Sequence, residues 1–281
     1  MRSGRFAFYS AAIPPAAMSF PLSRITAPFR MQPGLQRLGG EPRHLTALAP
    51  GSALWQEKKR VLESGASRLA VPGFDPQPAI AAILGQARAE GIAAAGPLEL
   101  AFEEDFAVLE AQGTTLPWLC VCVPSHWAPE DKLGLPFTAV HAPVADNGAL
   151  LSAASHLVRL VTGGERFERF VWTLTASGRY DQHPRRHARA PWPDTADADA
   201  FAAQCFLRAE RQTFFPVPGV PGQAVFTIRV MLQPLVEAVQ GAQDARRLHD
   251  ALASMSAAVL AYKGLAPARD RLLAWLAARA A

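Results

Sequence analysis

The chain has 281 residues, of which half are hydrophobic, and a formal net charge of +4 at pH 7, which is enough for one large domain with a substantial core. No run of five or more Lys and Arg residues occurs, and no stretch reaches the roughly 18 apolar residues of a membrane-spanning helix. Three cysteines are too few for a disulfide framework, so we expect a cytoplasmic protein that binds neither nucleic acid nor a membrane.

The N-terminal residues give no pattern that helps to predict the fold. A short apolar run follows two arginines, but Pro14 and Pro15 interrupt it, so a signal peptide is not expected. We expect residues 1–25 to be poorly ordered or a mis-assigned N-terminus, with Met18 as a candidate start. We expect residues 26–281 to form a single domain.

The hydrophobic pattern predicts helices first, then strands with an inserted helix, and finally helices again. Strands and helices that are segregated in this way favour an α+β domain with an antiparallel sheet. In chain order, the predicted elements are a helix over 75–90, a short helix or turn over 98–110, a strand over 116–123, a helix over 149–161, a strand over 167–175, a polar, proline-rich excursion over 181–200, a hairpin of strands 206–215 and 224–231, and helices over 248–262 and 267–280.

The most informative stretch is residues 118–144, which we call the motif segment. A strand-like apolar run breaks at Pro124, and Trp, His and charged residues follow among prolines that fix the backbone. A segment of this kind typically shapes a pocket for a flat, apolar and ionisable ligand. In order, it contains Pro124-Ser125, Trp127, Pro129-Glu130, Lys132, Gly134, His141, Pro143 and Val144.

Three shorter blocks accompany the motif segment. An acidic block precedes it and two basic blocks follow it, so that the whole pattern spans roughly residues 30–235. The blocks are Glu103-Glu104-Asp105-Phe106, then Arg169 with Trp172, and then Arg208 and Glu210-Arg211-Gln212-Thr213 with Phe226-Thr227-Ile228-Arg229.

In their shared order, these blocks resemble the haem-binding subunit of the haem-dependent oxidative N-demethylases, which are similar to dimethylamine monooxygenases. The resemblance implies a PAS-like antiparallel sheet with N- and C-terminal helical extensions and a bound haem b. It implies a monooxygenase that converts a small alkylamine to formaldehyde and the shorter amine. It also implies a hetero-oligomer with a reductase subunit that uses FMN, an iron–sulfur cluster and NADPH, and a tetrahydrofolate site that takes up the formaldehyde.

The chain departs from the family patterns at several positions, and each departure loses a polar or basic group or a proline. Val171 stands for the Asn of R-x-N-W, Leu135 stands where a basic residue is expected, Ala145 replaces a proline, and no arginine follows Thr213. These departures bear on the substrate, the folate site and the pairing of the haem propionates. They leave two alternatives to an enzyme, namely a haem-binding sensor or carrier and a haem-free scaffold subunit.

His141 is the residue that we expect to bind iron. Haem iron needs a strong axial donor, and neutral imidazole is a common one. The neighbouring Ala142-Pro143 restricts the backbone, so one ring nitrogen could face the metal and the other a partner. The alternative is a buried histidine bonded to a backbone carbonyl. Cys120 and Cys122 are competing ligands, although a free cysteine in an apolar strand is usually inert.

Five further residues are candidates for contact with the cofactor. Trp127 and Trp172 could stack on a porphyrin or line a cavity for a small amine, or they could simply pack in the core. Lys132 and Arg211 could pair with the propionates. Arg208 is a further candidate, although with Glu210 it could instead pair with Arg229 across the hairpin. The alternative for the basic residues is a solvated sheet face.

In this interpretation, three residues are candidates for catalytic roles. Glu104 or Asp105 could hold a secondary ammonium or relay a proton during oxygen activation. His126 could line the pocket or donate a hydrogen bond to dioxygen. The alternatives are a cluster of charges at a helix N-terminus and a partly exposed loop histidine.

Electrons must come from another polypeptide if this chain carries out oxygen chemistry. The sequence has no Gly-rich dinucleotide fingerprint, and its three cysteines fall short of the four that an iron–sulfur cluster needs. The densest basic stretch, residues 183–189, predicts either a solvated loop or a docking patch for an acidic redox partner or a nucleotide phosphate.

Overall fold

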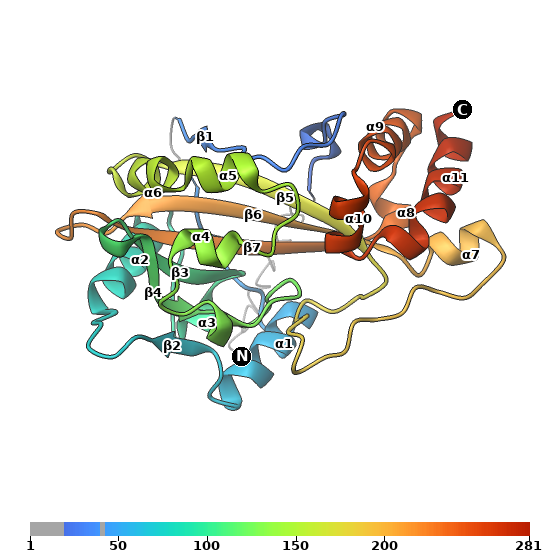
Figure 1. Ribbon diagram of the computed structural model, residues 1–281. Helices are drawn as coiled ribbons and strands as arrows, with labels where there is room; N and C mark the ends of the chain where they lie inside the picture. The colour runs from blue at the N-terminus through green and yellow to red at the C-terminus, as the bar shows by residue number, and fades with distance from the viewer. Residues whose placement is uncertain (1–19, 40–42) are drawn as a thin grey trace, which may run out of the picture.

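The computed structural model describes residues 20–39 and 43–281 and shows an α+β fold built on one antiparallel sheet (Figure 1). The predicted fold class is confirmed, whereas the PAS-like form of the sheet stays a prediction. Met18 and most of the predicted poorly ordered N-terminus lie outside the described residues. In their order across the sheet, the strands are β1 (Gln36–Arg37), β5 (Phe167–Thr175), β6 (Phe206–Pro216), β7 (Gln223–Pro234), β3 (Glu104–Glu110), β4 (Thr115–Cys120) and β2 (Arg68–Ala70).

The β6–β7 hairpin forms the centre of the sheet, as the sequence predicts. The connecting loop turns on Gly219 and Gly222, which both have a positive φ that favours glycine. The predicted pairing of Arg208 and Glu210 with Arg229 is wrong, because the register sets Arg211 opposite Arg229. Arg229 instead pairs at 2.7 Å with Glu103, the residue that precedes β3.

The prediction of a helix or turn over 98–110 is wrong for most of its length. Helix α3 covers only Leu98–Ala101, and β3 follows at Glu104. Residues 104–109 are all buried, because β3 is a central strand with both faces covered. Such a strand loses the polar–apolar alternation that would distinguish it from a short helix.

Helices pack on both faces and at one end of the sheet (Figure 1). The predicted helix over 248–262 is two helices, because the Ser256 hydroxyl accepts a hydrogen bond from the Val259 amide and begins a new helix there. The helices not yet named are α1 (Ala53–Glu63), α2 (Gln77–Ala89), α4 (Phe137–His141), α5 (Gly148–Ser152), α6 (Ala154–Thr162), α7 (Ala198–Ala202), α8 (Leu235–Ala238), α9 (Ala242–Ala253), α10 (Ala257–Lys263), α11 (Arg269–Ala280) and the short 3₁₀ turns η1 (Leu22–Arg24), η2 (Gln112–Thr114), η3 (Pro129–Asp131) and η4 (Ala266–Ala268).

The two faces of the sheet have different coverings. On one face, which we call the motif face, Trp127 of the motif segment packs over Leu119, and Val158 of α6 packs over Phe214. On the opposite face, α2 covers Phe106 and its neighbours, and the C-terminal helices cover the far ends of the strands. Because side chains alternate along a strand, the register assigns Arg169, Val171, Glu210 and Gln212 to the motif face and Phe170, Trp172 and Arg211 to the opposite face.

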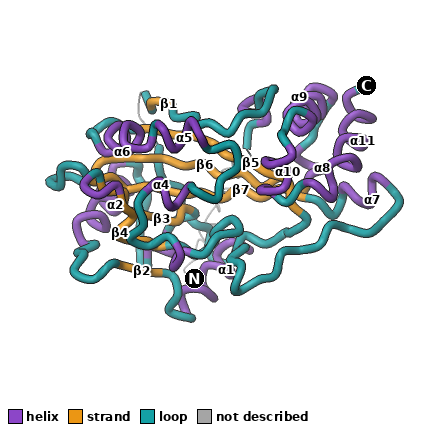
Figure 2. The backbone as a smooth tube through the Cα atoms, in the orientation of Figure 1, coloured by secondary structure: helices purple, strands orange, loops and turns teal. Residues whose placement is uncertain are grey.

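Residues near the described N-terminus belong to the core. Phe20, Leu22 and Ile25 are buried with the C-terminal helices. A long segment without helix or strand joins β5 to α7, as the proline-rich excursion predicts (Figure 2). No helix in the described part of the chain has the length and apolar character needed to cross a bilayer.

Candidate functional site

Ser125 of the motif segment joins two residues of β6. The Arg208 Nε donates a hydrogen bond of 2.8 Å to the Ser125 Oγ, which in turn donates to the Glu210 Oε1. The other Glu210 oxygen accepts from the Gln212 side-chain amide at 2.6 Å. The motif segment is therefore fixed to the motif face of the sheet by side chains of a single sequence block, the one that begins at Arg208.

Asp105 and Arg208 hold the strand-like start of the motif segment rather than a ligand. The Asp105 Oδ2 accepts a 2.8 Å hydrogen bond from the Val123 amide, and Arg208 donates one of 3.1 Å to the Val123 carbonyl. Behind Asp105 lies Lys58 of α1, whose Nζ is 3.1 Å from the Asp105 Oδ1 and donates to the carbonyls of Phe102 and Glu104. The charged side chains of Lys58, Asp105 and Arg208 are all buried, so this network holds the motif segment in place from inside the fold.

His141 ends helix α4 on the motif face. Its Nδ1 lies 2.8 Å from the Phe137 carbonyl, and the His141 and Phe137 rings are tilted by 31° with centroids 4.0 Å apart. Burial, aided by the charges of Arg169 and Lys132, lowers the pKa of His141 to about 4, although the bond to Phe137 acts in the opposite direction. The ring is therefore neutral at pH 7, and because a carbonyl only accepts, the proton lies on Nδ1. The lone pair of Nε2 is then available, which is the arrangement of a metal-bound histidine.

A cluster of ionisable groups surrounds this position. Arg169 has a buried Nε without a hydrogen-bond partner, and Glu210 is the acidic group whose charge acts on it most strongly. Tyr262 and Lys263, at the end of α10, are close enough to Arg169 and Glu210 to be influenced by both charges. Burial lowers the pKa of Lys263 to about 8 and raises the pKa of Tyr262. Sequence reasoning missed both residues, because nothing in a C-terminal helix links them to a site more than 90 residues upstream.

The remaining candidates in the motif segment surround the same region. Trp127 packs on the sheet beside Leu119, and the Lys132 Nζ donates a 2.8 Å hydrogen bond to the Val140 carbonyl in α4. His126 has a positive φ of 59°, an uncommon backbone conformation for this residue type. Burial, together with the charges of Arg189 and Arg208, lowers the pKa of His126 to about 4.

Three predicted site residues lie on the opposite face of the sheet. Trp172 packs edge-on against Phe29 among the C-terminal helices, and Arg211 is paired with Glu168 at 3.0 Å. Glu104 is buried, and its Oε2 accepts a hydrogen bond from the Thr46 amide while its Oε1 has no partner. The structure therefore does not bring these three side chains together with His141.

The cysteines are buried, and the basic stretch forms ion pairs within the chain. Cys120 and Cys122 are buried, and burial raises the pKa of both thiols. Arg185 binds Asp131 at 2.7 Å and Arg186 binds Asp181 at 2.8 Å, so the chain neutralises much of the stretch itself. Within the described ranges, no group of three or more His, Cys, Asp and Glu side chains could hold a metal ion. An axial haem ligand needs only one such side chain.

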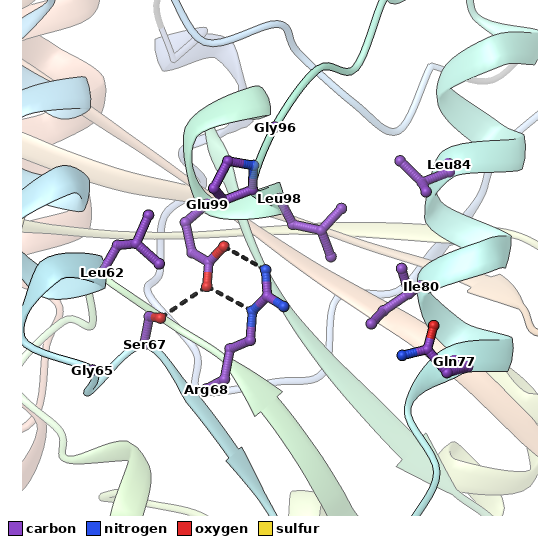
Figure 3. Close-up of a pocket in the computed structure, with 11 residues that line it drawn as sticks. Leu62, Gly65, Ser67, Arg68, Gln77, Ile80, Leu84, Gly96, Leu98 and Glu99 are labelled. Atoms are coloured by element: carbon purple, nitrogen blue, oxygen red, sulfur yellow. Dashed lines mark hydrogen bonds and ion pairs between the residues drawn. The ribbon is translucent and has the colours of Figure 1, made fainter.

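Two pockets lie away from His141. The larger, with a volume of about 670 Å³, opens between α1, α2, α3 and β2 (Figure 3). Arg68 crosses its floor and holds Glu99 with two hydrogen bonds of 2.7 Å, while Ile80 and Leu84 line one wall. The smaller, of about 170 Å³, lies beside Glu57 and Asp181.

A comparison with protein families matches residues 91–273 to the family described as haem-dependent oxidative N-demethylase, alpha subunit-like. The matched part covers the motif segment, the central strands and most of the C-terminal helices. The chain belongs to this family. The sequence-based recognition is therefore confirmed. The family description names haem as cofactor and oxidative N-demethylation as the reaction, and the term alpha subunit describes one part of a multi-subunit enzyme.

The residues on the motif face fit a haem-dependent family. Haem offers an iron that needs an axial donor and two propionate carboxylates that need cations. His141 supplies a neutral ring whose second nitrogen is already fixed by a carbonyl. Arg169 supplies a buried guanidinium nitrogen that lacks a partner. A propionate at Arg169 would give this nitrogen the acceptor that a buried donor requires.

Proposed function

We propose that this chain binds haem b through His141 and oxidatively N-demethylates a small amine to formaldehyde and the shorter amine. The observation that carries the proposal is the neutral His141 ring, with its Nδ1 proton bound to the Phe137 carbonyl, beside the unpartnered Arg169 Nε. When bound, haem supplies the activation of dioxygen that inserts one oxygen atom into an N-methyl C–H bond.

The residues of the chain itself would bind the haem and orient the amine substrate. The Nε2 of His141 would hold the cofactor on the motif face, and Arg169 would pair with one propionate and Lys132 with the other. Trp127 would cover part of the macrocycle. Glu210 is the carboxylate at the centre of the cationic cluster, and both of its oxygens accept only from neutral donors. It can therefore accept a hydrogen bond from the amine N–H of the substrate and orient the methyl group.

The proposal includes a separate reductase. Each turnover consumes two electrons, and the sequence offers neither a dinucleotide fingerprint nor four cysteines to carry them. The term alpha subunit in the family description supports a partner subunit. We propose that this partner uses NADPH, FMN and an iron–sulfur cluster, and that tetrahydrofolate accepts the formaldehyde.

The activity test is the release of formaldehyde from small N-methylamines by the haem-loaded chain with a flavin and iron–sulfur reductase and NADPH. We expect release that requires both dioxygen and the reductase, with one formaldehyde formed for each dioxygen consumed. Haem binding without formaldehyde from any N-methylamine would instead identify a haem carrier or sensor. Failure to bind haem would leave only the scaffold alternative.

A further inference from the structure

Helix α4, which ends at His141, is too short to fix its own position. It has five residues, and isolated helices of fewer than about 12 residues are marginal in water. The last four carbonyls of a helix lack partners within that helix, and in a helix of this length they are nearly all of its carbonyls. Groups outside α4 must therefore fix its end and, with it, the direction of the His141 ring.

Asn147 binds two successive carbonyls at the end of α4. Its Nδ2 donates a hydrogen bond of 3.0 Å to the His141 carbonyl and another of 3.0 Å to the Ala142 carbonyl. A side-chain amide has two N–H donors, so Asn147 uses both of them on the proposed iron ligand and the residue after it. The preceding carbonyl, that of Val140, accepts from the Lys132 Nζ at 2.8 Å. Side chains from both sides of α4 in the sequence thus hold its last turn.

The loop that carries Asn147 is fixed to elements other than α4. Asp146 has a positive φ of 53°, a conformation that Asp and Asn adopt more readily than most residues. Its Oδ2 accepts a hydrogen bond of 2.7 Å from the Ser256 hydroxyl, which also begins α10. The Asn147 carbonyl accepts from the Leu151 amide in α5 at 2.9 Å. The Asn147 amide is therefore a fixed point against which the end of α4 is held.

We propose that Asn147 is a positioning residue for haem, whose two N–H groups hold the end of α4 so that the Nε2 of His141 faces the iron. The bond from the His141 Nδ1 to the Phe137 carbonyl sets the tautomer and rotation of the ring. Asn147 sets the backbone from which that ring projects. Removing an outer group that orients a metal ligand typically lowers metal affinity by roughly 10- to 100-fold. This inference rests on the proposed function and adds a residue to its haem site.

The experiment measures the Kd of haem by absorbance titration for the wild-type chain, Asn147→Asp and Asp146→Asn. Asn147→Asp keeps the shape of the side chain but loses both donors and sets a carboxylate against two carbonyl oxygens. We expect a Kd that is at least about tenfold higher. We also expect the iron–histidine band in the resonance Raman spectrum of the ferrous haem to shift or disappear.

Asp146→Asn is the matched control, because it makes the reverse change on the adjacent residue. Its side-chain oxygen can still accept the hydrogen bond from Ser256, so its Kd and its iron–histidine band should equal those of the wild type. Circular dichroism of the haem-free variants checks that each one folds. If Asn147→Asp does not fold, Asn147→Ala removes the same donors without adding a charge and should give the same loss of affinity.

A second measurement tests the contact itself in the haem-free chain. Asn147 is the only asparagine in the sequence, so cell-free synthesis with asparagine that carries a heavy-nitrogen label in its side chain gives a single pair of amide signals in the NMR spectrum. We expect these protons to exchange with solvent more slowly in the folded chain than in the urea-unfolded chain, because both are hydrogen-bonded.

The outcomes separate the proposed function from the role of Asn147. If the wild-type chain binds no haem, the proposed function fails, and the role of Asn147 fails with it. If the wild type binds haem and the Asn147 variants bind it with the same Kd and the same iron–histidine band, the proposed function stands and the role of Asn147 is wrong. An equal loss of affinity in Asp146→Asn, or amide protons of Asn147 that exchange as fast as in urea, would also overturn that role.

Discussion

Replacing Asp105 with alanine should lower the free energy of unfolding by about 3 to 5 kcal/mol, the usual effect of breaking a buried ion pair. Asp105 and Lys58 are almost completely buried, at 2% and 0% exposed. Burial by itself would lower the pKa of Lys58, but the Asp105 carboxylate, with contributions from Cys122 and Cys120, outweighs this effect and raises it, so the lysine is charged. Without Asp105, that charge keeps only two backbone carbonyls as partners, and the Val123 amide loses its acceptor.

Urea denaturation of the haem-free chain measures this effect. The neighbouring helix residue provides a matched control, because Lys59 forms a solvent-exposed pair with Glu63 at 3.6 Å. Glu63→Ala should change the free energy of unfolding by no more than about 0.5 kcal/mol. The double variant Lys58→Met with Asp105→Asn removes both charges and should be more stable than Asp105→Ala. A loss below about 1 kcal/mol in Asp105→Ala would show that Asp105 does not hold the motif segment in place.

Replacing Glu104 with glutamine should stabilise the haem-free chain at pH 8 by up to about 3 kcal/mol. Burial raises the pKa of Glu104 from 4.5 to about 7, against the opposing effects of the Thr46 amide and Arg229. The folded chain therefore retains a proton that the unfolded chain loses between these two pH values. As pH rises through that window, the wild-type chain loses stability by an amount that the difference in pKa sets at about 3 kcal/mol.

The pH dependence is the decisive part of this prediction. Glutamine cannot ionise and can still accept the hydrogen bond from Thr46, so the gain should be absent at pH 4 and complete above pH 7. Glu103→Gln is the control on the adjacent residue. Because Glu103 pairs with Arg229 at 2.7 Å, that variant should lose stability at pH 8. Equal stability of Glu104→Gln and wild type at both pH values would contradict the raised pKa of the buried Glu104.

The sequence predicts those parts of the fold that depend on local pattern. Strand β5 has the predicted bounds, because glycines precede it and its aromatic side chains are typical of a strand. The β6–β7 hairpin follows from a loop of prolines and glycines. The sequence does not predict strand β3, since a central strand buried on both faces has no polar–apolar alternation to detect. Lys58 is a further case, because a lysine in a polar helix predicts a solvated face, and only the tertiary fold buries it.

In the candidate site too, local sequence pattern predicts some residues, and only the tertiary fold decides others. The motif segment contains Ser125, Trp127, Lys132 and His141, and the structure places these residues around the motif face. Trp172 and Arg211 belong to the sequence blocks but face away, because strand alternation sends neighbouring side chains to opposite faces. Lys263 on α10 is close enough to Arg169 and Glu210 for their charges to act on it, a proximity that no local pattern encodes. The order of the blocks therefore predicts the family, and the register of the sheet decides which block residues can share a ligand.

The measurement that tests the central claim most directly is the absorbance spectrum of the chain during titration with haem, for wild type and for His141→Ala. His156→Ala, at an exposed position on α6, is the matched control. We predict a Soret band that saturates at one haem per chain in the wild type and in His156→Ala, and its loss or marked shift in His141→Ala. A His141→Ala variant with the spectrum and stoichiometry of the wild type would contradict the assignment of His141 as the haem ligand.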